Sequence, residues 1–78
     1  MKIVRRMGDS PLLRGCATGE TCPDIFLLSD GNFAVIGTES TAALDSALPA
    51  GTSRSERQRI VVITRETLIR AKRDLPDV

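Results

Sequence analysis

The sequence contains no histidine, tryptophan or tyrosine, and its only aromatic residues are Phe26 and Phe33. Without histidine, imidazole-based general base catalysis, nucleophile–histidine pairs and histidine metal ligation are excluded. Both phenylalanines lie within apolar strand patterns, so aromatic platforms that stack single-stranded nucleic acid are not expected. Aliphatic side chains must therefore fill the core.

Long apolar runs are also absent. The longest, Ile25 to Leu28 and Ile60 to Ile63, are too short to cross a bilayer, and no apolar stretch follows the basic start Met1 to Arg6. We therefore expect a cytoplasmic protein without a signal peptide and without a membrane partner. Its 78 residues, 41% of them hydrophobic and 27% charged, allow one folded domain with one core.

Metal-binding and catalytic motifs are missing as well. Cys16 and Cys22 lack C-x-x-C spacing, so no metal site is expected. A disulfide between them would close a short loop, but the reducing cytosol weighs against it. Asp24 and Asp30 fall at opposite ends of a predicted hairpin, and no glycine-rich phosphate loop occurs. We expect neither an enzyme nor a bound cofactor.

The clearest pattern that is present is a β-hairpin over residues 24–38. Apolar runs flank Asp30-Gly31, a dipeptide typical of a two-residue type I′ turn. Such a turn would pair Leu28 with Phe33, and side chains would alternate between the faces. One face would then carry Phe26, Leu28, Phe33 and Val35, and the other Ile25, Leu27, Ala34 and Ile36.

Because both predicted faces are apolar, both need cover. We expect a C-terminal helix to cover one face, and the N-terminal segment, the middle of the chain or another chain to cover the other. The candidate interaction surface is one of two sets. These are Phe26, Leu28, Phe33 and Val35, or Ile25, Leu27 and Ile36.

The rest of the chain predicts an α+β fold, in which a small antiparallel sheet, made of the hairpin and a third strand, packs with a C-terminal α-helix. Glycine and proline punctuate residues 1–23, which predicts a loop-like segment with room for a short strand at Lys2 to Arg5 and an apolar anchor at Leu12 and Leu13. Glu39 to Leu48 favours a short helix capped at Ser40 or Thr41. Residues 49–58 predict a mobile linker.

Residues 59–75 predict a strand followed by a helix. Ile60 to Ile63 is a β-branched run typical of a strand buried on both faces. Thr64 is a suitable N-cap for a helix over Arg65 to Leu75. Leu68, Ala71 and Leu75 would form its apolar stripe, with Ile69 beside it.

Basic residues support an alternative function, the binding of nucleic acid. The candidate phosphate contacts are Arg5, Arg6, Arg70, Lys72 and Arg73. The net charge is only +1, and the sequence shows no helix-turn-helix pair. A solvated basic face is therefore the favoured interpretation of these residues.

Short motifs between residues 16 and 75 resemble a group of small actinobacterial proteins related to the BldB-like family. The motifs are Thr21-Cys22-Pro23-Asp24-Ile25, the Asp30-Gly31 turn, Phe33-Ala34-Val35-Ile36-Gly37, Arg59-Ile60-Val61-Val62-Ile63 and Arg65-Glu66-Thr67-Leu68. The resemblance implies accessory work in transcriptional regulation without enzymatic activity. It also implies self-association and a helix-turn-helix regulator as partner. Together with the apolar hairpin, it leads us to expect a homodimeric interaction module.

Overall fold

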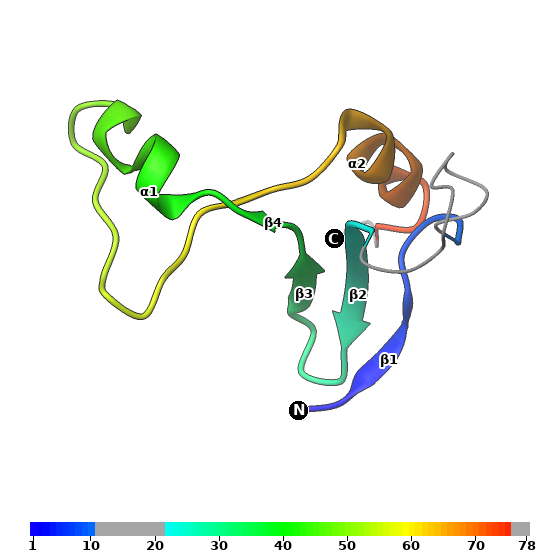
Figure 1. The fold of residues 1–78 in the computed structure, drawn as a ribbon. Helices are drawn as coiled ribbons and strands as arrows, with labels where there is room; N and C mark the ends of the chain where they lie inside the picture. The colour runs from blue at the N-terminus through cyan, green and yellow to red at the C-terminus, as the bar shows by residue number, and fades with distance from the viewer. Residues whose placement is uncertain (11–21, 76–78) are drawn as a thin grey trace.

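The computed structural model describes residues 1–10 and 22–75. Its elements are β1 (Ile3–Arg6), β2 (Asp24–Leu28), β3 (Phe33–Ile36), β4 (Thr38–Glu39), α1 (Thr41–Leu44), the 3-10 turn η2 (Asp45–Ala47), β5 (Val61–Val62) and α2 (Arg65–Lys72). Strands β1, β2 and β3 form an antiparallel sheet in that order, and β4 pairs with β5. The predicted α+β class, with an antiparallel sheet and a C-terminal helix, is confirmed (Figure 1).

The hairpin lies where it was predicted, but its register differs by one residue. Phe33 pairs with Leu27 and not with Leu28. The loop has three residues: the Gly31 N–H donates to the Leu28 carbonyl at 3.1 Å, and the Leu28 N–H donates to the Asn32 carbonyl at 2.9 Å. A three-residue loop requires only one left-handed residue, here Gly31 with φ of 88°, whereas a type I′ turn requires two.

The one-residue shift changes which side chains share a face. Because side chains alternate along each strand, Ile25 and Leu27 now share a face with Phe33 and Val35. Phe26 shares the opposite face with Ala34 and Ile36, and Asp24 and Leu28 lie on it too. The two predicted face sets are therefore wrong in their β3 members.

The core lies between α2 and the Ile25 face of the sheet. Met7, Ile25 and Ala71 are buried together, with Leu27 and Ile63 packed against them. The chain reaches this position through Gly8, whose φ is +83° and whose absent Cβ would lie 2.9 Å from the Ala71 backbone nitrogen. The C-terminal helix therefore covers one hairpin face, as predicted.

Helix α2 begins as predicted and docks differently. Thr64 is its N-cap, and the Thr64 side chain accepts a hydrogen bond from the Thr67 N–H. Its buried residues are Thr67 and Ala71, whereas Leu68 and Leu75 are exposed. Because Ala71 is small, the Gly8 backbone can approach the helix closely there, and this docking leaves the larger Leu68 and Leu75 at the flank of the helix. The predicted apolar stripe is therefore wrong at these two leucines.

The third strand of the main sheet is β1 rather than the run from Ile60 to Ile63. Strand β1 lies in the segment predicted to be loop-like, close to the short strand considered at Lys2 to Arg5. Only Val61 and Val62 of the later run form a strand, β5, and both are exposed. The β-branched run was therefore correctly assigned as a strand, but its predicted burial on both faces is wrong.

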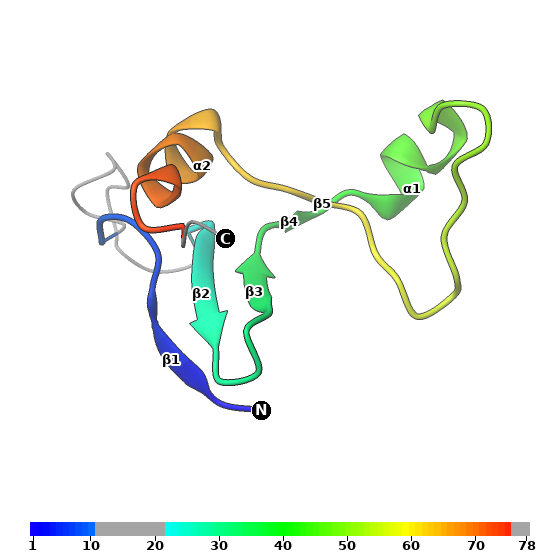
Figure 2. The ribbon, with the colours of Figure 1, turned by 180° about the vertical axis from the view of Figure 1, so that it is seen from behind.

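Residues 38–62, here called the arm, project from the sheet (Figure 2). The predicted helix over Glu39 to Leu48 is divided into α1 and η2, with Ser40 as N-cap. The base of the arm is joined by the Ser40 N–H to the Ile60 carbonyl and by the Ile60 N–H to the Thr41 hydroxyl oxygen, both at 2.8 Å. The Thr41 hydroxyl and N–H both hydrogen-bond the Glu39 carboxylate, which lowers the pKa of Glu39.

The outer loop of the arm is held by one arginine. Arg54 makes two hydrogen bonds to the Asp45 carboxylate, at 2.9 and 3.1 Å, and also donates to the carbonyls of Ser55 and Gln58. These contacts span part of residues 49–58. The mobility predicted for that linker remains a prediction, and these bonds are what would have to break for the whole linker to move.

Candidate interaction surface

The outer edge of β3 pairs with no strand of the described part of the chain. In antiparallel pairing, alternate residues direct their backbone groups to the same neighbour. The Leu28 N–H donates to the Asn32 carbonyl, so the backbone groups of Leu28 point towards the β3 side. The Ile25 carbonyl accepts from the Met7 N–H, so the backbone groups of Ile25 point towards β1. It follows that Ala34 and Ile36 bond β2, while the N–H and C=O groups of Phe33 and Val35 point away from the sheet. No strand in residues 1–10 and 22–75 pairs with that edge.

Apolar side chains are exposed along this edge. Phe33, Val35 and Ile36 are 40%, 45% and 53% exposed. Phe33 and Val35 lie on the face that carries α2, and Ile36 lies on the other face. The segment from Phe33 to Gly37 carries no charge, no proline and, within the described pairing, no bulge, the devices that usually protect a sheet edge.

The opposite edge of the sheet, formed by β1, is protected. Its register is irregular between Ile3 and Arg5, and the charged residues Lys2, Arg5 and Arg6 lie along it. Lysine and arginine on an edge strand oppose pairing with a further strand, particularly with a copy of itself. The two edges of one sheet therefore differ sharply in their capacity to pair.

Of the seven predicted interaction residues, the structure leaves only the β3 members well exposed. Ile25 and Leu28 are buried, and Phe26 and Leu27 are half-buried. Sequence reasoning missed the exposed apolar residues Val4, Val61 and Val62. Their β-branched character, the only available signal, indicated strands without indicating which side would be solvated.

An ion pair occupies the face of the sheet opposite α2. The Arg6 Nε donates to the Asp24 carboxylate at 2.8 Å, and the Arg6 guanidinium carbon lies 5.6 Å from the centre of the Phe26 ring. Asp24 is only 4% exposed. Arg6 was a candidate phosphate contact, and here it holds β1 against β2 instead.

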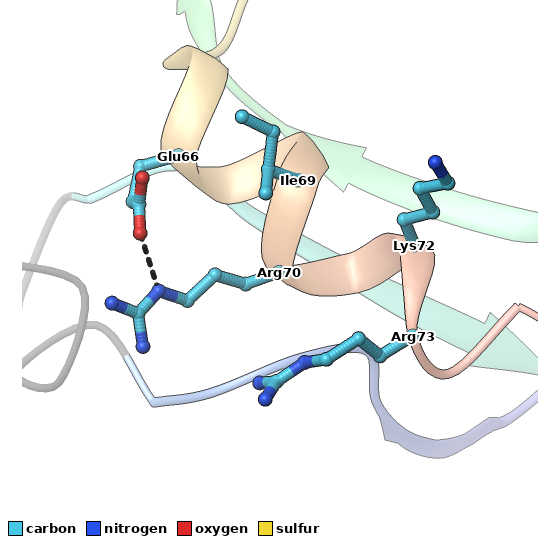
Figure 3. Close-up of a pocket in the computed structure, with 5 residues that line it drawn as sticks. All are labelled: Glu66, Ile69, Arg70, Lys72 and Arg73. Carbon is cyan, nitrogen blue, oxygen red and sulfur yellow. Dashed lines mark hydrogen bonds and ion pairs between the residues drawn. The ribbon is translucent and has the colours of Figure 1, made fainter.

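Along α2 to its C-terminal end, an open hollow is lined by Arg70, Lys72 and Arg73 together with Glu66 and Ile69 (Figure 3). Arg70 and Arg73 both donate to one carboxylate oxygen of Asp9, at 2.6 and 2.8 Å, and Arg70 also binds Glu66. The hydrogen bond from Arg70 lowers the pKa of Asp9, and the charge of Arg73 adds to this shift. Both guanidinium groups are therefore engaged within the protein.

The remaining candidate phosphate contacts are Arg5 and Lys72. The Arg5 Nη2 donates weakly to the Asp74 carbonyl at 3.4 Å. Lys72 forms no ion pair with any residue that the structure describes, and its side chain points away from Arg70 and Arg73 (Figure 3). The five candidates do not converge on one unpaired basic surface.

The described residues contain no group of three or more histidine, cysteine, aspartate or glutamate side chains placed to hold a metal ion. Cys22 is in a disulfide, contrary to the reduced state that the cytosolic interpretation favoured. Cys16, Leu12 and Leu13 lie outside the described residues. Within residues 1–10 and 22–75, no helix has the length and apolar character needed to span a bilayer.

Comparison with known proteins adds no assignment: no family model, no curated protein and no solved structure matches this chain.

Proposed function

We propose that this chain is a non-enzymatic protein-interaction module that acts as a homodimer. The observation that carries the proposal is the open β3 edge, where Phe33, Val35 and Ile36 are exposed beside backbone groups that no strand of residues 1–10 and 22–75 pairs. Exposed strand edges bind other strands through main-chain hydrogen bonds, and the neighbouring side chains supply apolar contact.

The size of the core supports the same proposal. Among residues 1–10 and 22–75, the buried cluster consists of Met7, Ile25 and Ala71, whereas apolar side chains on β3, β5 and α2 remain exposed in the single chain. A domain this small gains little stability from its own burial. Association would remove further apolar surface from water and add to the stability of the fold.

The biological setting rests on the family resemblance. On that basis we propose an accessory role in actinobacterial transcriptional regulation, beside a helix-turn-helix regulator. A direct nucleic-acid function has less support, because Arg6, Arg70 and Arg73 are held by Asp24, Asp9 and Glu66.

Sedimentation equilibrium from micromolar to millimolar concentration tests the proposed function. We expect the average mass to approach twice that of the chain as the concentration rises. A mass that stays monomeric over the whole range would contradict the homodimer. Addition of urea at a concentration that leaves the fold intact should shift the equilibrium towards the monomer, because urea weakens apolar association.

A further inference from the structure

We infer that two copies associate through antiparallel pairing of β3 with β3 of the partner, centred on Val35, to form one continuous six-stranded sheet. The inference rests on the proposed function and specifies the surface that carries it. The strand order would be β1-β2-β3 in one copy, followed by the same strands in reverse order in the other.

The register follows from the direction of the backbone groups. Phe33 and Val35 direct their N–H and C=O groups outwards, so these residues form the hydrogen-bonded positions of any added strand. A two-fold axis at Val35 places Val35 opposite its own copy and Phe33 opposite Gly37. Each residue then meets the same contact in both subunits, as an isologous interface requires.

The side chains fit this register. An added Cβ at Gly37 would lie 2.7 Å from the Val62 carbonyl oxygen and 3.1 Å from the Val61 Cβ, so β5, with Val61, lies over Gly37 on the face to which Val35 also points. Phe33 of the opposite subunit would arrive beside Val61 on that face. Ile36 would lie opposite Ala34 on the other face. The pairing therefore uses Phe33, Val35, Ile36 and Val61, all of which are exposed in the single chain.

Charge favours a second copy as the occupant of this edge. The segment from Phe33 to Gly37 is uncharged, so self-pairing about Val35 opposes no like charges. Moving the two-fold axis by one residue, to Ile36, would place Glu39 opposite Phe33. Antiparallel pairing of β1 with its own copy about Val4 would place Lys2 opposite Arg6, two like charges. The β3 edge is the one at which this sheet can extend itself without electrostatic cost.

Amide hydrogen exchange measured by NMR on the full chain tests the pairing directly. The amides of Ala34 and Ile36 are bonded to β2 and should be protected at every concentration. The amides of Phe33 and Val35 should exchange freely in the monomer and become protected as the dimer forms. A dimer in which these two amides still exchange freely would overturn the inference and leave the proposed function standing.

A pair of matched variants provides the second test. Val35→Lys places two lysines opposite each other across the two-fold axis and should weaken dimerisation about tenfold or more, a change of about 1.4 kcal/mol or more. Val4→Lys makes the same substitution at an exposed valine on the β1 edge and should leave the dissociation constant within about twofold.

Dimerisation of Val35→Lys like that of the wild type, or dissociation of Val4→Lys instead, would also overturn the inference. A wild type that remains monomeric at millimolar concentration would overturn the homodimer as well, and would leave a strand from another protein as the occupant of the edge. If Val35→Lys does not fold, as judged by lost protection of the Ala34 and Ile36 amides, the inference is tested by the wild type alone, through the protection of its Phe33 and Val35 amides on dimerisation.

Discussion

Gly8 and Ala71 are in backbone-to-backbone contact: a Cβ on Gly8 would lie 2.9 Å from the Ala71 nitrogen. Gly8 also has a φ of +83°, and its N–H donates to the Asp74 carboxylate at 2.7 Å. A single glycine, two positions after the end of β1, therefore positions the whole C-terminal helix.

Gly8→Ala should accordingly be severe. The substitution adds left-handed backbone strain to a steric clash with α2, and we expect the free energy of unfolding to fall by about 2–5 kcal/mol. Gly31→Ala is the matched control: Gly31 has a φ of +88° and open space around its Cβ position. It should cost only the strain, about 1–2 kcal/mol. Urea unfolding measures both, and equal losses would show that the Gly8 contact is unimportant.

The buried Asp24 should contribute more than a comparable surface ion pair. Asp24→Asn removes the charge that Arg6 meets at 2.8 Å in a site that is 4% exposed, and should cost about 1–3 kcal/mol. Asp45→Asn disrupts the Arg54 pair, which has similar distances but lies at the surface, and should cost less than about 1 kcal/mol. The reverse order in chemical denaturation would contradict the assignment.

Asp9 should link stability to pH in a defined direction. Its folded pKa is lowered, chiefly by the hydrogen bond from Arg70, so its contribution is present above the unfolded pKa and is lost as pH falls through the folded pKa. Asp9→Asn should therefore be less stable than the wild type at neutral pH, and the difference should shrink below about pH 4. Denaturation midpoints from pH 7 to pH 2 give the comparison. A difference that grows on acidification would refute it.

Arg54→Ala should loosen the arm without unfolding the sheet. Arg54 holds Asp45 and the carbonyls of Ser55 and Gln58, and none of these residues contributes to the core cluster. Exchange of the Gln58 amide, which donates to the Ser55 carbonyl, should accelerate. Protection of the β2 and β3 amides should be unchanged. A global loss of protection would mean that the arm supports the sheet.

Binding of duplex DNA should be weak at physiological salt. Arg70 and Arg73 share Asp9, so neither guanidinium is available without breaking an internal ion pair. Asp9→Asn should therefore increase retention on DNA at low salt, if the variant retains its fold by circular dichroism. Tight, salt-sensitive binding by the wild type would instead support the nucleic-acid alternative.

The sequence located the hairpin but could not define its register. Ser29-Asp30-Gly31-Asn32 is compatible with a two-residue and with a three-residue loop, because Gly31 can occupy the left-handed position of either. The choice reversed the predicted face of every β3 side chain. Thr64 was found as a helix cap because the signal is local: its hydroxyl accepts from the Thr67 N–H three residues later.

Strand β1 and the candidate surface depend on contacts distant in sequence. Arg6 is held in a strand by its ion pair with Asp24 and its contact with the Phe26 ring, and nothing near Arg6 in the sequence indicates these contacts. Likewise, the composition of β3 predicted burial, whereas its exposure follows from its place at the end of the sheet.

The contact between Gly8 and Asp74 joins groups that are 66 residues apart along the chain. During synthesis, the hairpin can leave the ribosome and form its turn early, but Met7 and Ile25 cannot complete their cluster until Ala71 has emerged. Closure over so long a separation is entropically slow. From the emergence of Ile36 until α2 has formed, the nascent chain therefore has the open β3 edge without the helix that anchors the sheet, and its exposure to wrong strand partners is greatest in this interval.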